Sequence, residues 1–516
     1  MTYIRKDLWK LGETWNPTLL WYAKAVHELQ KRPITDPTSW RFLAAIHGFK
    51  AELWANDGYY RPGEELPPAS VRELYWGRCQ HRTWFFLPWH RPYLLAFEQI
   101  VRAAVVKLGG PSDWALPYWD YDDYLERPET LGLPQAFYEK TLPDGSPNPL
   151  ALPTRLRYGT DGKGKVELTP AKIDFTDAAN ELLYKGTPKG NAGFGGQNPV
   201  TTPAEDLVFG LLESMPHNQV HNMVGGDNGK PGKANHEGLM ADTRTAGLDP
   251  VFWLHHANID RLWQIWLNRD PHHHNPKEPD FVNGPPQDSP FVFPDENGDS
   301  RFWKVGETLD LKTLGYTYES FHDPVPKAAP APKQVAAFAA KAAVAAVKEP
   351  VVELIGANSS SLKLVGRKSV SQVRLDKPGV AKVAKHLAAK GLVANNVAAP
   401  SHERVFLNLE SIRGQRNNVF IEVYVGLPAG AQPDAHPELC AGGVSLFGVA
   451  AASDPADPHG GNGDNASLEL TEIVNALRAK GALDLAQVQI DLVPDKDLSA
   501  DDELSVGRIS IYRQGE

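Results

Sequence analysis

Cysteine is scarce in this sequence, which has two Cys among 516 residues. Two cysteines cannot form the disulfide framework that stabilises many secreted domains, so folding does not require an oxidising compartment. Long apolar runs are also lacking, because no stretch approaches the ~18 uncharged apolar residues of a membrane-spanning helix. We therefore expect no membrane segment.

Positive charge is not concentrated anywhere along the chain. The 53 Lys and Arg residues are outnumbered by 63 Asp and Glu, and the net charge of −10 is spread along the sequence. Nucleic-acid binding depends on clustered Lys and Arg that contact phosphates, so we expect no nucleic-acid partner. The first ten residues carry charges where a signal peptide would have its apolar core, which favours a cytoplasmic location.

Composition divides the chain, whose length predicts two to four domains, into three parts. Residues 1–325 hold all 14 Trp and alternate helical periodicity with Pro- and Gly-rich loops. Residues 326–350 consist mainly of Ala, Pro, Lys and Val, which is typical of a linker. Residues 351–516 contain short β-branched or alternating segments between turns. The sequence thus predicts a mainly α domain that carries the active site on a four-helix bundle, then a linker and an all-β sandwich.

Apolar periodicity indicates where the main elements lie. In the first domain we expect helices over residues 89–107, 204–224 and 250–268. In the last domain we expect seven strands, over residues 361–365, 370–375, 404–409, 419–425, 444–449, 487–492 and 506–512. Seven short strands of this kind are typical of a β-sandwich.

Histidine is abundant, with 17 residues, and several lie in apolar surroundings. His81 and His90 flank an aromatic run, and His255 and His256 lie inside the apolar segment 249–260. A buried imidazole is costly unless it has a hydrogen-bond partner or a metal. These histidines are therefore candidates for metal ligands.

His217 and His221 form an i, i+4 pair, which places two imidazoles on one helix face about 5–6 Å apart at Cβ. Such a pair alone is more often two ordinary histidines than a metal site. Here His47 adds a further histidine in an apolar segment, so each half of the domain offers three. Six imidazoles on separate helices indicate a two-metal site in a helix bundle.

The ligand types narrow the choice of metal. A di-iron carboxylate bundle needs two Glu-x-x-His motifs, and the chain has one, at Glu319–His322. A zinc hydrolase needs His-Glu-x-x-His or mixed carboxylate or thiolate ligands, and these are missing. Coordination by imidazoles alone favours copper over magnesium, manganese or iron. The pattern therefore predicts a pair of copper ions.

Two motifs also resemble a known family. The run from His81 to Glu98 resembles the first copper signature of tyrosinases, catechol oxidases and molluscan haemocyanins, and the run from Asp249 to Asp260 resembles the second. The resemblance covers roughly residues 1–325. It implies one copper held by His47, His81 and His90, another held by His217, His221 and His256, and O2 as co-substrate. His255 is then a neighbour of the metal ligands.

The resemblance extends to further site residues. Cys79, in Cys-Gln-His81, implies a thioether crosslink between Cys79 and His81, for which a buried free thiol is the alternative. Glu213 and Asn218 resemble the pair that holds a water at the site, although a carboxylate that interacts with a helix N-terminus is the alternative for Glu213. Thr243 and Asn222 occupy the positions of a substrate gate.

Two carboxylates at the ends of the copper motifs have a structural interpretation. We expect Asp260 and Glu98 to orient the helices that carry the histidines through ion pairs, with Arg91 and Arg261 as partners.

The C-terminal region resembles the domain that shields the active site in latent polyphenol oxidases and in haemocyanin units. This weaker match rests on the stretches 404–414, 419–428 and 440–448, while Tyr316-Thr-Tyr318 resembles the Tyr-x-Tyr that closes the catalytic domain. The resemblance implies that the β-domain covers the site until the linker is cut. Four lysines in the linker offer sites to proteases.

The function expected is that of a polyphenol oxidase. Such an enzyme hydroxylates small monophenols ortho to the oxygen and oxidises o-diphenols to o-quinones. The alternatives are a catechol or o-aminophenol oxidase without activity on monophenols, and a haemocyanin-like O2 carrier, which uses the same ligands. A homo-oligomer is possible.

Overall fold

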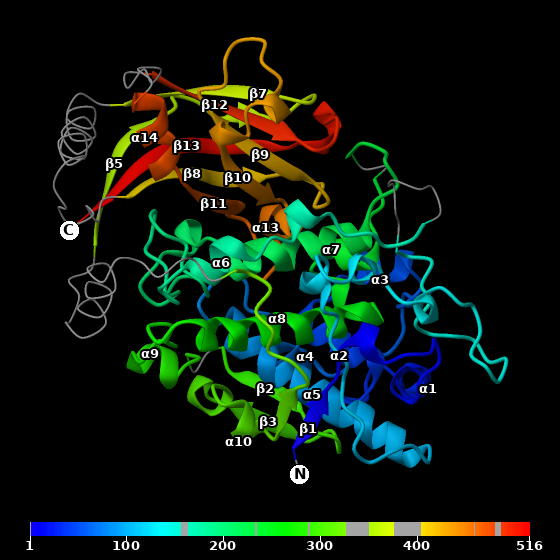
Figure 1. The fold of residues 1–516 in the computed structure, drawn as a ribbon. Coiled ribbons are helices and arrows are strands. Elements are labelled where there is room, and N and C mark those ends of the chain that lie inside the picture. Colours follow the sequence, from blue (N-terminus) through cyan, green and yellow to red (C-terminus); the bar gives the residue numbers. More distant parts are fainter. Residues whose placement is uncertain are drawn as a thin grey trace. The chain divides into compact units, whose positions relative to one another are not determined.

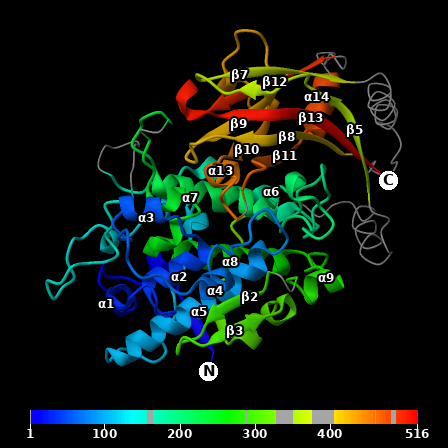
Figure 2. The ribbon, with the colours of Figure 1, turned by 180° about the vertical axis from the view of Figure 1, so that it is seen from behind.

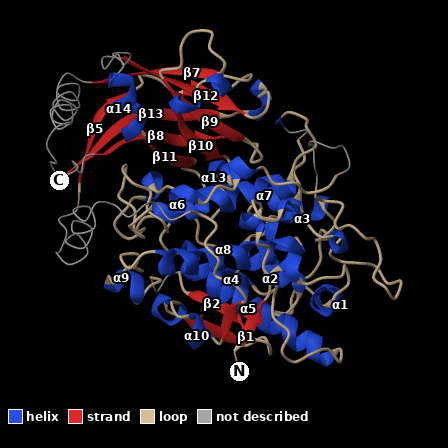
Figure 3. Cartoon of the chain, viewed as in Figure 1, coloured by secondary structure: helices blue, strands red, loops and turns tan. Residues whose placement is uncertain are grey.

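The computed structural model describes residues 2–155, 164–232, 235–286, 289–326, 350–375, 404–458, 460–479 and 487–515. Its contacts divide the chain into two compact units. Unit 1 comprises Met1–Tyr184, Leu211–Lys230 and Asn235–Val325, and unit 2 comprises Lys185–Gly210, Pro231–Ala234 and Pro326–Glu516. Helices dominate unit 1, and the large sheet belongs to unit 2 (Figure 3).

The domain limits expected from the sequence differ from these units in one respect. Unit 2 contains residues 185–210 and 231–234, which lie within the stretch expected to form the first domain. Of the expected linker 326–350, all but the two end residues lie outside the described residues. The linker therefore stays a prediction.

Unit 1 is built around two long helices, α5 (Phe86–Lys107) and α8 (Pro250–Arg269). Both are buried along most of their length, as expected for helices that are apolar on nearly every face. Phe97 of α5 stacks on Trp253 of α8 with ring centroids 3.6 Å apart. Among the described residues, no helix is both long and apolar enough to cross a bilayer.

Shorter elements surround this pair (Figure 1). They are α1 (Pro17–Lys31), α2 (Trp40–His47), α3 (Ala51–Asn56), α4 (Ala69–Tyr75), α6 (Thr176–Asn180), α7 (Asn218–Gly225), α9 (Pro279–Val282), α10 (Leu311–Leu314), and two strand pairs, β1 (Tyr3–Arg5) with β4 (Tyr316–Tyr318) and β2 (Phe291–Pro294) with β3 (Ser300–Trp303).

Polar caps set where the helices that carry histidines begin. Ser39 accepts a hydrogen bond from the Phe42 N–H at the start of α2, and Asp249 accepts one from the Val251 N–H at the start of α8. Pro250 follows as the first residue of α8, where its fixed φ suits a helix and its missing N–H costs nothing.

The single helix expected over residues 204–224 is wrong. The chain instead forms a short 3₁₀ turn, η6 (Ala204–Asp206), then a π-helical turn, η7 (Glu213–His217), and then α7. Met215 has an extended backbone (φ −152°, ψ 125°) because it precedes Pro216, and proline disfavours the helical conformation for the residue before it.

Unit 2 has nine described strands in one sheet. They are β5 (Val351–Ala357), β6 (Leu362–Lys363), β7 (Ser369–Leu375), β8 (Arg404–Arg413), β9 (Phe420–Val425), β10 (Cys440–Ser445), β11 (Asp464–Glu469), β12 (Gln487–Pro494) and β13 (Ser505–Gly515). The order is β10-β9-β12-β7-β5-β13-β8-β11, with β6 paired to β13, and every pairing is antiparallel.

The expected β domain is mostly β, and the strands that the structure describes form one sheet instead of the two sheets of a sandwich. The end strands of the order, β10 and β11, contact each other, so the sheet curls round on itself (Figure 2). Strand twist makes such curling favourable, and it covers sheet edges that would otherwise be exposed. Two helices, α13 (Val449–Ser453) and α14 (Thr471–Ala479), complete the described part of unit 2.

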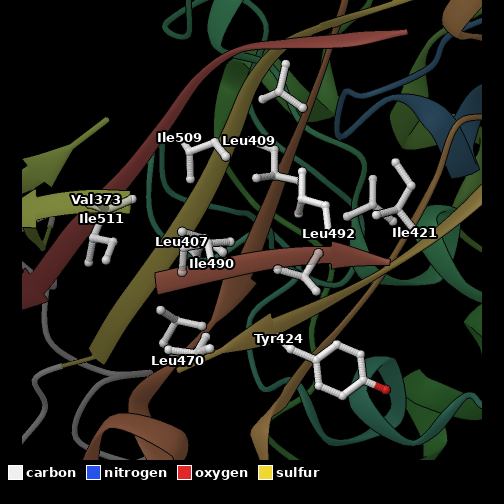
Figure 4. Packing of buried hydrophobic residues seen from close by; sticks show 14 of the residues in the cluster. Val373, Leu407, Leu409, Ile421, Tyr424, Leu470, Ile490, Leu492, Ile509 and Ile511 are labelled. Carbon is white, nitrogen blue, oxygen red and sulfur yellow. The ribbon is translucent and has the colours of Figure 1, made fainter. Parts of the chain in front are cut away.

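The core of unit 2 comes from alternate residues of neighbouring strands (Figure 4). Leu407 and Leu409 of β8 lie two residues apart, and so do Ile490 and Leu492 of β12, and all four are fully buried. A spacing of two places side chains on one face of a sheet. This alternation is the pattern that identified most of the strands from the sequence.

Candidate metal centre

One group of histidines lies at the ends of α2 and α5. His47 is the last residue of α2, His81 lies in the loop before α5, and His90 lies in the first turns of α5. The His47 ring centroid is 5.3 Å from that of His81 and 5.8 Å from that of His90. Nitrogen atoms of the three rings and the sulfur of Cys79 all lie within 4.8 Å of one another. Such a group could hold a metal ion.

Backbone carbonyls orient two of these rings. His47 Nδ1 lies 2.7 Å from the carbonyl oxygen of Thr243, and His90 Nδ1 lies 2.7 Å from that of Phe86. A carbonyl oxygen only accepts hydrogen bonds, so both Nδ1 atoms carry the proton and both Nε2 atoms keep their lone pairs. The Nε2 of His47 is buried without a hydrogen-bond partner, which fits a metal ligand.

A second group comes from η7, α7 and α8. His256 Nε2 lies 3.3 Å from His217 Nε2 and 3.2 Å from His221 Nε2. His221 Nδ1 lies 2.9 Å from the Met240 carbonyl oxygen, so here too Nε2 keeps its lone pair for the site. The extended backbone of Met215 interrupts the helix between Glu213 and α7. Glu213 therefore does not have the position relative to His217 and His221 that an unbroken α-helix would give it.

The two groups share one site. The ring centroids of His90 and His256 are 4.5 Å apart and the rings are nearly parallel, while those of His81 and His217 are 6.2 Å apart. Helices α2, α5, α7 and α8, together with η7 and the loop before α5, thus bring together all the histidines expected as metal ligands. Two metal ions could be held side by side.

Burial keeps five of these six imidazoles neutral. It lowers the pKa of His47 to about 4 and that of His217 to about 3. It also lowers the pKa values of His90, His221 and His256. A neutral imidazole is the form that binds a metal, so at pH 7 these ligands need not release a proton first.

His255, expected as a neighbour of the ligands, lies within the second group. Its ring stacks on that of His217 with centroids 5.3 Å apart, and its Nδ1 lies 3.2 Å from the Tyr121 hydroxyl. Next to Tyr121, burial raises the pKa of Asp122 to about 7, and Asp122 accepts a hydrogen bond from Asn258. This cluster was not predictable from the sequence, because Tyr121 and Asp122 lie far from His255 and Asn258 in the chain.

Cys79 lies beside the first group. Its sulfur is 3.5 Å from His81 Nε2 and 3.4 Å from His90 Nε2, and burial raises the pKa of the thiol. The sulfur is therefore close to two imidazoles, of which His81 is the expected crosslink partner. The other cysteine, Cys440, lies in unit 2.

Glu213 and Asn218 flank the second group. The Glu213 carboxylate accepts the Arg82 backbone N–H, at 3.2 and 3.0 Å from its two oxygens. Arg82 has a positive φ of 62°, which turns this N–H toward the carboxylate. Asn218 Oδ1 lies 2.8 Å from His217 Nδ1, whereas Asn218 Nδ2 is buried without a hydrogen-bond partner. A water molecule would satisfy that amide.

Thr243 and Asn222, expected as gate residues, both lie close to histidine ligands. Thr243 supplies the carbonyl that orients His47 and is half-buried, while Asn222 follows His221 on α7 and is buried. Their assignment to a gate stays a prediction.

Asp260 joins α8 to its neighbours, as expected. It accepts hydrogen bonds from Arg91 at 2.5 Å and from the hydroxyls of Tyr316 and Tyr318, both at 2.6 Å. Burial opposes ionisation, but Arg91 and Arg5 overcome it and lower the pKa of Asp260. The Tyr-x-Tyr of β4 thus binds the middle of α8 through Asp260.

Glu98 joins the same network from α5. Arg5 donates to Glu98 at 2.7 Å, and Arg102 pairs with Glu98 one turn further along α5. The expected partner Arg261 is not used by either carboxylate but pairs with Asp120 at 3.0 Å. Sequence reasoning missed Arg5, because nothing in a short N-terminal strand indicates that its arginine lies between two helices.

Known protein families match both the part of the chain that holds these histidines and the C-terminal part. Residues 37–269 match the family model described as the common central domain of tyrosinase, and residues 351–514 match a domain of unknown function (DUF7868). Tyrosinase HcTyr1 of Hahella sp. (strain CCB-MM4) is 32% identical over 521 residues, which span 99% of both chains. Polyphenol oxidase II of Ipomoea batatas is 29% identical over 58% of this chain and 47% of its own length.

Solved structures share the fold of the whole chain. A recombinant latent aurone synthase, a polyphenol oxidase, has a TM-score of 0.57 and 20% identity, over 99% of this chain and 89% of that one. A latent apple tyrosinase has a TM-score of 0.52 and 23% identity, over 99% and 97%. With a relative 32% identical along its entire length, the chain belongs to the tyrosinase and polyphenol oxidase family.

Proposed function

We propose that this protein is a copper-dependent polyphenol oxidase. It hydroxylates monophenols ortho to the oxygen and oxidises o-diphenols to o-quinones, using O2. The observation that carries the proposal is the meeting of two groups of mostly buried imidazoles beside Glu213 and Asn218. Family membership supports an oxidoreductase with a dinuclear type-3 copper centre.

The donor set fits copper. His47, His81 and His90 would hold one ion, and His217, His221 and His256 the other. The neutral imidazoles and the partnerless Nε2 of His47 are what such a site requires, and imidazole suits copper better than harder metals. When bound, the copper pair would supply the redox chemistry by which O2 oxidises phenols.

Glu213 and Asn218 would handle the proton of the substrate. A phenol is a poor electron donor until its oxygen loses a proton. A water held by the Asn218 amide and the Glu213 carboxylate would take that proton as a general base. The Arg82 N–H keeps the carboxylate in place meanwhile.

Kinetics on a monophenol and a catechol test this assignment. Glu213→Gln should slow monophenol hydroxylation about 100-fold, the size typical of a general base, and slow catechol oxidation much less. Glu129→Gln, at an exposed position of the same unit, is the control. Equal losses on both substrates, or none, would show that Glu213 has another role.

The same measurement separates the alternatives. Oxidation of catechols or o-aminophenols by the wild-type protein without monophenol hydroxylation would indicate a catechol or o-aminophenol oxidase. Reversible O2 binding without turnover of either substrate would indicate a haemocyanin-like carrier.

A thioether between Cys79 and His81 would fix the loop before α5. The sulfur lies 3.5 Å from the His81 ring, close enough for a bond after a small movement. Mass spectrometry of the peptide that contains both residues should show a species lighter by two hydrogen atoms. The unmodified mass alone, after copper loading in air, would contradict the crosslink.

Latency is a further part of the proposal. The aurone synthase and the apple tyrosinase whose folds resemble this chain are latent forms. A hundredfold suppression requires a closed state favoured by about 2.7 kcal/mol, which an inter-domain interface could supply. Truncation near residue 325 should then raise the rate on bulky phenols, and an unchanged rate of the truncated protein would argue against latency.

A further inference from the structure

Residues 185–210, which we call the strap, form an unusual connection. They lead from Tyr184 to Leu211, both in unit 1, yet the strap itself belongs to unit 2. Its one regular element is the short turn η6, although residues 191–198 are buried. Loops of this length without their own secondary structure are uncommon in compact domains and are usually functional.

The first half of the strap is hydrogen-bonded to three strands of unit 2. The Lys189 carbonyl accepts from Asn408 of β8 at 2.8 Å, and the Gly190 carbonyl accepts from Ser467 of β11 at 2.7 Å. The Asn191 N–H donates to Gln514 of β13 at 3.0 Å. Three successive backbone groups are thus bound by side chains of β8, β11 and β13.

The second half of the strap is held by one amide. Asn465 of β11 donates from Nδ2 to the carbonyls of both Glu205, at 2.9 Å, and Leu207, at 3.1 Å. Asn408 and Asn465 are 2% and 4% exposed, so water does not compete for these bonds.

Ion pairs link the two ends of the strap to each other and to the sheet. Lys189 lies 2.7 Å from Asp206, at the other end of the strap, and 3.4 Å from Glu410 of β8. These side chains are mostly buried, which strengthens the attraction relative to one at the surface.

Two glycines of the strap are packed so closely that a larger side chain would not fit. A Cβ on Gly190 would lie 2.1 Å from Gln514 Oε1, and one on Gly210 would lie 2.5 Å from the Gly196 nitrogen. A second internal segment is held similarly, since the Gly232 N–H donates to Asp502 of unit 2 at 2.9 Å. Two segments far from the C-terminus thus belong structurally to unit 2.

We propose that the strap anchors the C-terminal region to the rest of the protein, so that cutting the linker does not release it. The surface formed by Asn408, Glu410, Asn465, Ser467 and Gln514 is a binding site whose occupant is the strap of the same chain. The strap ends at Gly210, three residues before Glu213. Displacement of unit 2 must therefore either break these bonds or pull on the chain that leads to Glu213. The anchoring does not depend on the proposed activity.

Fragment association tests the anchor. A site for a sequence-specific protease is introduced into residues 327–349, the full-length protein is cut, and the fragments are separated by size-exclusion chromatography over a dilution series. The wild-type fragments should elute together. The double variant Asn408→Ala, Asn465→Ala should raise the dissociation constant at least about 100-fold, or tenfold for each amide, which is about 1.4 kcal/mol each.

The control is Gln372→Ala, on β7, whose side chain is hydrogen-bonded to Gln489 within the sheet. It should leave the association unchanged. Separation of the wild-type fragments after cutting would overturn the proposal, and so would a double variant whose fragments bind as tightly as those of Gln372→Ala. Because the assay needs no substrate turnover, a failed anchor and a failed activity give different results.

A milder variant keeps the test valid if the double variant does not fold. Ser467→Ala removes the single donor to the Gly190 carbonyl. In the uncut protein it should speed hydrogen exchange at the neighbouring Asn191 amide at least tenfold, while exchange in β12 stays unchanged. Equal exchange at Asn191 in both proteins would contradict the anchor.

Discussion

At the scale of single residues, burial decides the chemistry of the site. A neutral histidine in a dry helical core is costly, and the apolar sequence around His81, His90 and the His255–His256 pair already indicated a metal. The groups that orient the rings were not predictable, because the carbonyls of Thr243 and Met240 act irrespective of their side chains. The role of Arg82 was likewise invisible, since it acts through its backbone N–H.

The copper-free protein should lose stability as the pH falls from about 7 to about 4. Burial lowers the pKa of His47 to about 4 and that of His217 to about 3, whereas both titrate near 6.5 when unfolded. Between these values the unfolded chain binds more protons, so stability rises with pH, by up to about 1.4 kcal/mol per pH unit for each histidine. Urea unfolding at stepped pH measures this slope, and a flat profile over the window would contradict it.

Gly48→Ala should weaken the binding of the copper held by His47. A Cβ at position 48 would lie 2.7 Å from the Thr243 carbonyl oxygen, which orients the His47 ring, and 2.8 Å from the Arg244 Cα. We expect a loss of about 1–3 kcal/mol in stability from the overpacking and a lower copper content. Gly132→Ala is the control, because its nearest atom would lie at an ordinary 3.4 Å. Metal analysis giving equal copper in both variants would count against this role of Gly48.

At the scale of elements, apolar periodicity predicted the helices and strands that bury one face or a continuous apolar run. It located α5, α8 and most strands, because these elements bury side chains at regular intervals. It missed β11, whose sequence Asp-Asn-Ala-Ser-Leu-Glu has little β propensity and is a strand through its pairing with β8. It also extended a strand to Val449, where β10 has ended and α13 begins.

Asp260→Asn should destabilise unit 1 by about 3–5 kcal/mol, the usual cost of breaking a buried ion pair. The change leaves Arg91 and Arg5 buried beside a neutral side chain. It also replaces the two carboxylate oxygens that accept from Arg91 and two tyrosines with a single amide oxygen. Because the pKa of Asp260 is lowered in the folded state, its contribution is present above the unfolded pKa of about 3.9 and is lost at lower pH. Denaturant unfolding near neutral pH measures the loss. Asp113→Asn, at an exposed position, should change little.

At the scale of the whole molecule, the two structural units do not coincide with the domains expected from composition. The Ala- and Pro-rich stretch correctly suggested a change of domain type, from helical to mostly β. It could not show that residues 185–210 belong with the second unit, because a glycine-rich loop has no periodicity that would indicate its partner. Nor could strand patterns distinguish one curled sheet from two, since pairing order is a long-range property.

Deletion of residues 326–516 should therefore differ from cutting the linker. Deletion removes the side chains of β8 and β11 that bind the strap, so the strap loses these hydrogen bonds, each with a net value of about 0.5–1.5 kcal/mol. We expect the truncated protein to melt at lower temperature than the cut complex and to aggregate. Calorimetry of both forms measures this, and equal melting temperatures would indicate that the strap is stable alone.

The central claim is that two groups of three histidines hold a coupled pair of copper ions. Electron paramagnetic resonance of the oxidised, copper-loaded protein, together with its copper content, tests it most directly. The account predicts two coppers per chain and almost no signal, because paired Cu(II) ions couple their spins, with an isolated-copper signal appearing in His256→Ala. One copper per chain, or a signal that accounts for both ions in the wild-type protein, would contradict it.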